Sequence, residues 1–293
     1  MNNPFKGAGT ALVTPFKKDY SVDFDALKKL IEFQIAGDID FLVVQGTTGE
    51  SPTLSWEEKL EILKTVTDVN AGKKPIVFGL GGNNTLEIAN KMKAIPRTVD
   101  GILSVSPYYN KPIQNGIVEH FKYISSHTDL PIILYNVPGR TGSNMSVETT
   151  IELSKVENIV AVKEASGNME QIMEIIRQRP DGFGVLSGDD ALVLPLVAAG
   201  ADGVISVVSN AFPKQFSDMV KWTATENHQA AVAIHYNLTE ITRHFFAEGN
   251  PGGVKEALLE LGLMDNCMRL PLYNVSNELA EKIKAETRRI VQG

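Results

Sequence analysis

The chain has 293 residues, of which 43% are hydrophobic and 22% charged, an ordinary balance for a globular protein in water. Its net charge of −7 argues against nucleic acid or an anionic membrane as the main partner. The single cysteine, Cys267, excludes an internal disulfide and fits a reducing cytosol. No basic segment followed by an apolar run opens the chain, and no apolar stretch reaches about 18 residues. We therefore expect neither a secretory signal nor a transmembrane helix, and a cytoplasmic location.

Eight short apolar runs, rich in β-branched residues, recur along the chain and end near Gly, Pro, Ser, Thr or Asn. They occupy residues 9–16, 41–46, 75–81, 101–107, 131–138, 159–166, 183–190 and 203–210. Apolar strands that alternate with helices are typical of a parallel sheet covered on both faces. Eight such units without a break in composition favour an α/β fold closed into a (β/α)8 TIM barrel. An open, doubly wound sheet is the alternative.

Helical periodicity fills the segments between these runs. Residues 23–37 place Leu27, Leu30 and Ile31 on one face. Residues 55–69 begin with Ser55 followed by Glu58 three positions later, which is a capping box. Both segments are predicted to be amphipathic helices that cover the sheet.

The pattern changes after residue 211, where strand-like runs cease and helical periodicity continues to a last predicted helix at about 273–292. This segment is long enough for the eighth barrel helix and a small helical addition. We predict a barrel over residues 1–225 and a C-terminal helical extension over residues 226–293.

Polar residues at the carboxyl ends of the predicted strands are the candidates for chemistry, because the active site of such a barrel lies at that end. Lys163 stands out, since it ends the apolar run "IVAVK" and a buried ammonium is costly unless it is paired or neutralised. The other candidates at strand ends are Thr47, Thr48, Tyr108, Tyr109, Tyr135 and Arg140.

The predicted strand ends contain no histidine and few residues that could bind a metal ion. The five histidines fall in helical stretches and are interpreted as packing or surface residues: His120, His127, His228, His235 and His244. Without a histidine base, a Ser-His or Cys-His mechanism is excluded. The acidic pair Asp189 and Asp190 is better explained as a helix N-cap than as a metal site. We expect no metal and no cofactor.

A buried lysine is a nucleophile toward carbonyls, because desolvation leaves part of it as the free amine that can form a Schiff base. The alternative is a structural lysine that ends a strand and pairs with Glu164. The Thr47-Thr48 turn suits a carboxylate, Tyr135 could relay protons, and Arg140 could hold a second carboxylate. Together these residues describe a site for an α-keto acid and a second acidic substrate.

The motifs "GTTGE", "PYYN", "YNVPGRTG", "VKEASG", "SGDD", "GVISV", "NPGGVKEAL" and "RLPL" occur in this order over nearly the whole chain. In these motifs the sequence resembles the dihydrodipicolinate synthase family. The lysine and tyrosine are shared by the wider superfamily of pyruvate-dependent aldolases and lyases. The double threonine, the tyrosine pair and the arginine are more specific to the synthases.

The resemblance implies a lyase that condenses pyruvate with L-aspartate 4-semialdehyde, an early step in diaminopimelate and lysine biosynthesis. Lys163 would form the Schiff base, and Thr48 and the backbone carbonyl of Ile205 would hold pyruvate. Arg140 would bind the carboxylate of the semialdehyde. A proton relay would consist of Tyr135, Thr47 and Tyr109. The resemblance also implies a homotetramer built as a dimer of dimers, in which Tyr109 reaches in from a neighbouring subunit.

Members of this family that lysine inhibits bind it at the tight dimer interface. The matching positions here are Ser51, Pro52, Trp56, Lys59, Asn83, Glu87 and Tyr108. Lys59 stands where many inhibited bacterial enzymes have histidine, and its permanent charge would repel a cationic ligand. We predict that inhibition by lysine is weak or absent.

Three alternatives use the same lysine. A sister aldolase would cleave N-acetylneuraminate or a 2-keto-3-deoxy sugar acid, and Arg140 argues against it because a sugar chain needs hydroxyl partners. A sensor would bind a keto acid without turnover. A pyridoxal phosphate enzyme would need a phosphate cradle, for which residues 79–84 are a weak candidate.

Overall fold

The computed structural model describes residues 3–225 and 227–292. Its eight strands form a closed barrel in sequence order, which confirms the predicted (β/α)8 fold and excludes the open sheet. The strands are β1 Gly7–Ala11, β2 Phe41–Val44, β3 Ile76–Gly79, β4 Gly101–Val105, β5 Ile132–Asn136, β6 Ile159–Glu164, β7 Gly184–Ser187 and β8 Gly203–Ser206.

Helices follow the strands, and further helices occupy the C-terminal part, as predicted. The α-helices are α1 Phe24–Ala36, α2 Trp56–Asn70, α3 Thr85–Met92, α4 Gln114–Ser125, α5 Pro138–Thr141, α6 Val147–Leu153, α7 Met169–Gln178, α8 Val193–Ala198, α9 Pro213–Thr223, α10 His228–Ala247, α11 Gly252–Glu260 and α12 Asn277–Gln292. Short 3-10 helices are η1 Thr47–Gly49, η2 Ser51–Thr53, η3 Asp190–Leu192 and η4 Val208–Asn210. The predicted boundary between barrel and extension falls at residue 226, which lies outside the described residues, and it stays a prediction.

The strands are shorter than the apolar runs that predicted them, and the backbone shows why at the end of β2. Gln45 has a φ of 66°, so β2 stops at Val44. The eighth run continues past β8 into η4 without remaining extended. Apolar character therefore marks burial along these segments, whereas hydrogen-bond geometry sets where each strand ends.

Capping explains the observed helix ends. The Glu58 backbone N–H donates to Ser55 Oγ at 3.2 Å and the Ser55 N–H donates to Glu58 Oε2 at 2.9 Å, which confirms the capping box before α2. The last helix starts at Asn277, later than the predicted residue 273. There, Ser276 Oγ accepts a hydrogen bond from the backbone N–H of Leu279 at 3.3 Å, and this bond fixes the start of the helix.

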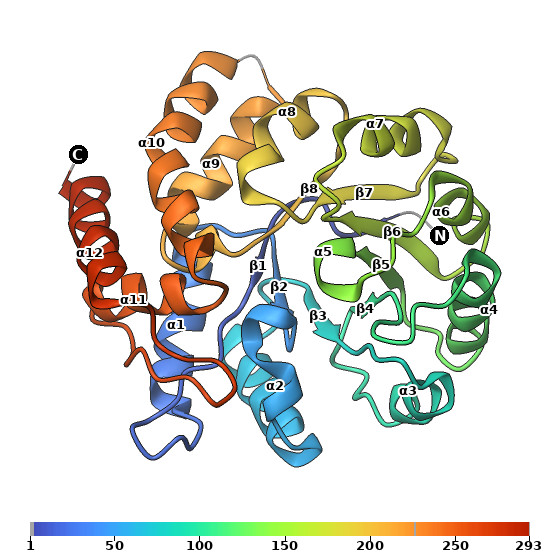
Figure 1. The fold of residues 1–293 in the computed structure, drawn as a ribbon, viewed down its shortest axis with the longest axis horizontal. Coiled ribbons are helices and arrows are strands. Elements are labelled where there is room, and N and C mark those ends of the chain that lie inside the picture. Colours follow the sequence, from blue (N-terminus) through green and yellow to red (C-terminus); the bar gives the residue numbers. More distant parts are fainter. Residues whose placement is uncertain (1–2, 226, 293) are drawn as a thin grey trace. The chain divides into compact units, whose positions relative to one another are not determined.

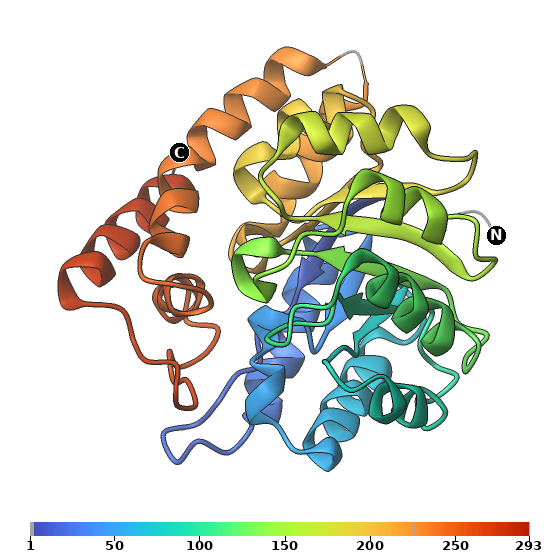
Figure 2. The same ribbon diagram turned by 45° about the vertical axis from the view of Figure 1, so that its right-hand side comes forward.

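The chain divides into two compact units, residues 3–7 with 75–205 and residues 8–74 with 206–292, and each is described by itself. In the first unit, β4, β5, β6 and β7 lie side by side with parallel pairing, and α3, α4, α6 and α7 lie outside them (Figures 1 and 2). The register pairs Val105 with Tyr135 and Tyr135 with Lys163. The end of β5 thus lies between the ends of β4 and β6.

The second unit contains β2, most of β1, and the helices α1, α2 and α9 to α12. Helix α10 packs against α9, α11 and α12 (Figure 1). Helix α11 is buried from Gly252 to Leu258, although it contains a lysine and a glutamate. Among the described residues, no helix is both long and apolar enough to cross a membrane.

Candidate active site

Lys163 is buried near the end of β6, where all six residues of the strand are buried. Its side chain is 6% exposed, and its Nζ lies 4.3 Å from the centroid of the Tyr135 ring. The two residues are direct neighbours across the β5–β6 ladder. Within the described part of the chain, the amine forms no hydrogen bond and no ion pair. The structure therefore brings together the two residues that the sequence singled out most strongly, and it leaves the amine unpartnered.

Glu164 does not pair with Lys163, which removes the structural alternative for this lysine. Successive strand residues point to opposite faces of a sheet, so Glu164 lies behind the strand while Lys163 faces the other way. Its carboxylate accepts hydrogen bonds from Asn136 Nδ2 at 2.7 Å, Ser166 Oγ at 2.7 Å and Gln171 Nε2 at 3.1 Å. Burial raises the pKa of the Glu164 carboxyl, and these hydrogen bonds oppose the shift.

Gly188 leaves the room that the Lys163 side chain occupies, a role that was not predicted. A Cβ added at Gly188 would lie 2.9 Å from Lys163 Cε and 2.7 Å from Ala165 Cβ, closer than real contacts allow. Its backbone N–H donates to the Glu164 carbonyl at 2.6 Å. Only glycine leaves the lysine stem in this place, although the motif "SGDD" alone does not reveal the reason.

Arg140 lies in the short helix α5, directly after β5, and its side chain is exposed. Its backbone N–H donates to the Val137 carbonyl at 2.9 Å. Among the described residues, its guanidinium has no hydrogen-bond or ion-pair partner. The arginine is thus free to bind a carboxylate ligand, which a planar guanidinium can do with two parallel hydrogen bonds.

The tyrosine pair follows β4 and projects outward. Tyr109 is 86% exposed and has a φ of 73°, an uncommon conformation for a bulky residue. The carbonyl of Tyr108 accepts hydrogen bonds from Asn83 Nδ2 at 3.2 Å and from the Asn110 N–H at 2.9 Å. Ile205 is buried in β8.

Thr47 and Thr48 form η1 in the second unit, in the turn after β2. Thr48 is buried, and its Oγ1 accepts a hydrogen bond from Asn250 Nδ2 at 3.0 Å. A hydroxyl that already accepts keeps its own proton for another partner, so Thr48 is set to donate. Thr47 is exposed. The motif around Asn250 does not reveal this contact, because the two residues are 202 positions apart.

The positions matched to a regulatory lysine site divide between the two units. In the second unit, Ser51 lies in η2 and both Trp56 and Lys59 lie in α2, all half-buried. In the first unit, Asn83, Glu87 and Tyr108 are exposed, and Glu87 pairs with Lys91 at 2.5 Å. Their role in regulation stays a prediction.

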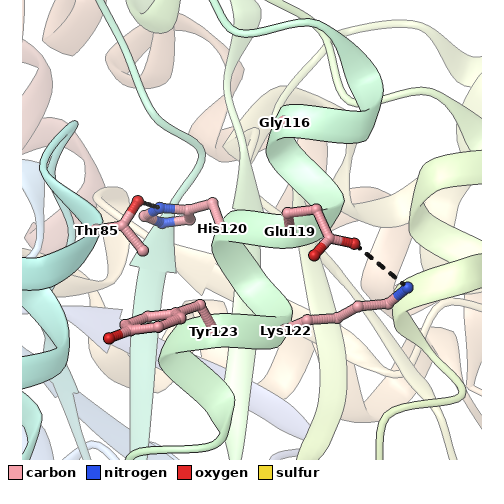
Figure 3. A pocket seen from close by; sticks show the side chains of 6 residues that line it. All are labelled: Thr85, Gly116, Glu119, His120, Lys122 and Tyr123. Atoms are coloured by element: carbon pink, nitrogen blue, oxygen red, sulfur yellow. Dashed lines mark hydrogen bonds and ion pairs between the residues drawn. The ribbon is translucent and has the colours of Figure 1, made fainter.

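His120 packs between helices, as the sequence predicted. It lines a hollow on the outer side of α3 and α4, and its Nδ1 lies 2.9 Å from Thr85 Oγ1 (Figure 3). Burial lowers its pKa to about 4. The hollow is lined by Thr85, Gly116, Glu119, His120, Lys122 and Tyr123, none of which is a predicted site residue. His127 lies in the turn after α4, so the prediction that all five histidines fall in helical stretches is wrong for this residue.

Asp189 acts as an N-cap, as predicted, because its carboxylate accepts a hydrogen bond from the Ala191 N–H at 3.0 Å at the start of η3. In the described ranges, no group of three or more His, Cys, Asp or Glu side chains is placed to hold a metal ion.

A closed (β/α)8 barrel with a buried lysine at the carboxyl end of its sixth strand has the architecture of a barrel enzyme that can form a Schiff base. The model of the Dihydrodipicolinate synthetase family matches residues 4–290, and the chain belongs to this family. A curated relative from Cytophaga hutchinsonii, named 4-hydroxy-tetrahydrodipicolinate synthase, is 48% identical over 281 residues, covering 96% of this chain and 95% of the relative.

Solved structures agree with this assignment. Dihydrodipicolinate synthase from Aquifex aeolicus superposes with a TM-score of 0.94 at 42% identity, covering 97% of this chain and 98% of that one. The chloride-inhibited dihydrodipicolinate synthase from Acinetobacter baumannii, solved in complex with pyruvate, gives a TM-score of 0.95 at 38% identity, covering 98% and 99%. The chain is an enzyme, as the sequence predicted, and these relatives do not favour the sister aldolases.

Proposed function

We propose that this enzyme condenses pyruvate with L-aspartate 4-semialdehyde through a Schiff base on Lys163, in diaminopimelate and lysine biosynthesis. One observation carries the proposal: the Lys163 amine is buried beside Tyr135 without a hydrogen-bond or ion-pair partner among the described residues. An amine with no such partner keeps its lone pair and its protons uncommitted, so it can reach a bound carbonyl carbon.

The chemistry follows from that amine. The nitrogen attacks the keto carbon of pyruvate, and loss of water gives an iminium that withdraws electrons from the methyl group. Loss of a methyl proton yields an enamine, whose carbon attacks the aldehyde of the second substrate. The amine of that substrate then replaces the lysine at the former keto carbon. This step closes the ring and restores free Lys163.

The other predicted residues take roles that match their chemistry. The Thr48 hydroxyl would donate a hydrogen bond to the pyruvate carboxylate, since its oxygen already accepts one from Asn250. The backbone carbonyl of Ile205 would also hold pyruvate, and Arg140 would bind the carboxylate of the semialdehyde. The phenol of Tyr135 would move protons to and from the Schiff base, together with Thr47 and Tyr109.

Measuring condensation and cleavage side by side tests the substrate assignment. We expect turnover of pyruvate with L-aspartate 4-semialdehyde, and no cleavage of N-acetylneuraminate or 2-keto-3-deoxy sugar acids above background. Cleavage of a sugar acid with a higher kcat/KM would favour the sister aldolase. Binding of pyruvate without turnover of any of these substrates would favour the sensor.

The proposed assembly is a cytoplasmic homotetramer, a dimer of dimers in which Tyr109 serves the active site of a neighbour. The strong exposure of Tyr109 and its uncommon φ support a contact outside its own chain. Co-expression of Lys163→Ala and Tyr109→Phe subunits tests this exchange. A mixed dimer would contain one site with both groups intact, so activity above that of either variant alone is expected. Activity no higher than the sum of the two homo-oligomers would contradict it.

A further inference from the structure

Behind Lys163 and Tyr135, a closed network of polar side chains joins the ends of β5 and β6. Asn136 and Glu164 are paired across the ladder, one position after the Tyr135–Lys163 pair. Both are fully buried, and Asn136 Nδ2 donates to Glu164 Oε1 at 2.7 Å. Because side chains alternate between the two faces, this bond on the outer face fixes the pairing of the two residues on the inner face.

The same asparagine holds both ends of the loop that carries Arg140. Its Nδ2 also donates to Asn144 Oδ1 at 2.8 Å, and its Oδ1 accepts from the Met145 N–H at 3.0 Å. The loop between these contacts contains α5 and its arginine. Asn136 therefore ties the end of the loop back to the strand from which the loop departs.

Gln171, in the first turn of α7, completes the network. Its Nε2 donates to Glu164 Oε1 at 3.1 Å, and its Oε1 accepts from Asn144 Nδ2 at 2.7 Å. We call the side chains of Asn136, Asn144, Glu164 and Gln171 the β5–β6 clasp. Within the described residues, no cation contacts the buried carboxylate of the clasp, so neutral amide and hydroxyl donors alone satisfy it.

Arg140 depends on this loop for its position, since its guanidinium has no hydrogen-bond or ion-pair partner among the described residues. A long, exposed side chain with no partner is placed only by its backbone. The clasp holds both ends of the loop that carries Arg140, and Glu164 of the clasp directly follows Lys163 in the chain.

We propose that Asn136 and Glu164 are positioning residues that hold the backbone of Arg140 in place relative to Lys163 and so determine where the second substrate's carboxylate binds. This inference rests on the proposed function, because it gives Arg140 the substrate contact named there. Pyruvate capture by Lys163 does not involve Arg140. Loss of the clasp should therefore affect the second substrate selectively.

The test compares steady-state constants for Asn136→Ala, Asn144→Ala and Asn158→Ala. Asn158 is the matched control, since its side chain also donates to two backbone carbonyls, those of Ser125 at the end of α4 and Thr128, but at the opposite end of β6. Asn136→Ala removes every hydrogen bond of the Asn136 side chain, and we expect its KM for L-aspartate 4-semialdehyde to rise about tenfold. Its KM for pyruvate should change less than twofold. Asn144→Ala should shift the same constant in the same direction by a smaller factor, and Asn158→Ala should shift neither.

Glu164→Gln provides the conservative check, because its amide oxygen can still accept from Asn136 and Gln171. It should keep both KM values near those of the wild type, whereas Glu164→Ala should resemble Asn136→Ala. If Asn136→Ala and Asn158→Ala lower stability alike and leave the ratio of the two KM values unchanged, Asn136 is merely structural and the inference is wrong. If Asn136→Ala does not fold, Asn144→Ala replaces it in the test. An unchanged ratio of its KM for L-aspartate 4-semialdehyde to its KM for pyruvate would then show that the inference is wrong.

Hydrogen exchange separates a failure of this inference from a failure of the proposed function. Asn136→Ala and Asn144→Ala should speed amide exchange in residues 137–145 and leave the amides of β6 protected. This readout needs no substrate, so it judges the clasp even if the wild type does not condense the two substrates. Unchanged exchange in this loop would overturn the clasp, whatever the activity shows.

Discussion

Lys163 and Lys255 are both buried, with 6% and 0% of their surface exposed, but their surroundings differ completely. Lys255 Nζ donates to Glu50 Oε1 at 2.5 Å and to the carbonyls of Thr14 and Cys267, each at 2.8 Å. Lys163 Nζ instead lies over the ring of Tyr135, 4.3 Å from its centroid, and it has no hydrogen-bond or ion-pair partner among the described residues. A lysine amine that donates to three acceptors is committed to structure, whereas one without acceptors in the described chain is available to react.

This contrast shows that burial alone does not identify a catalytic lysine. The number of hydrogen bonds that its amine makes separates the two cases, because an ammonium has three protons to donate. Lys255 uses all three. It also anchors Glu50, which follows the Thr47-Thr48 turn directly, so it supports the second unit's part of the proposed machinery without reacting.

Replacing Lys163 by Met gives the largest expected effect on activity. We expect kcat/KM for condensation to fall at least about a thousandfold, because the nucleophile is removed. Thermal stability should stay equal or rise, since the amine makes no hydrogen bond or ion pair with any described residue. Steady-state assays and thermal unfolding check both parts. A marked loss of stability would show that Lys163 is structural.

Replacing Lys255 by Met gives the largest expected effect on stability, whereas Lys163→Met should lower activity and leave stability unchanged or higher. Unfolding free energy should fall by about 3–5 kcal/mol, because the Glu50 carboxylate is left buried and unpaired. The double variant Lys255→Met with Glu50→Leu should recover much of that loss. Urea unfolding measures all three proteins. If Lys255→Met is as stable as the wild type, the two lysines do not differ as described.

His120 extends the comparison to a buried group that stays neutral. Its pKa is lowered from 6.5 to about 4, so between these values the unfolded chain binds more protons than the folded one. The contribution of His120 to the free energy of unfolding is therefore fully present above pH 6.5 and is lost as the pH falls toward 4. Between pH 8 and 5 we expect a loss of about 2 kcal/mol.

The variant His120→Gln checks this assignment, since it cannot titrate but can still bond to Thr85. Urea unfolding at pH 8 and pH 5 should show a smaller difference for the variant than for the wild type. Equal differences would mean that other groups account for the acid sensitivity.

Lys59 is a third lysine, half-buried in α2, and its replacement is expected to have the smallest effect. Millimolar L-lysine should inhibit the wild type weakly or not at all, because the two cations repel. Lys59→His should increase inhibition several-fold by reducing that repulsion near pH 7. Initial rates against L-lysine concentration measure both. Low-micromolar inhibition of the wild type would contradict this prediction.

Much of the fold could be predicted from the sequence, because barrel strands covered on both faces appear as apolar runs. The ends of the strands could not, since they depend on single backbone conformations such as that of Gln45. The start of α12 depends on the Ser276 cap, which a periodicity argument overlooks.

Lys163 was predictable because lysine is conspicuous at the end of an apolar strand. Its lack of a partner was not, because adjacency in sequence suggested Glu164, and strand alternation turns the two side chains to opposite faces. Glu164 instead bonds to Asn136, which lies 28 residues away. Lys255 was overlooked because it stands in a helix, where lysine is usually exposed, and its partner lies 205 residues away.

Trapping with pyruvate and borohydride, followed by peptide mass mapping, tests the central claim most directly. The Lys163 amine should capture pyruvate and be reduced to a stable secondary amine, while Lys255 in the same sample stays unmodified. A reduced adduct on Lys163 alone is the predicted result. No adduct, or an adduct on another lysine with Lys163 unmodified, would contradict the account.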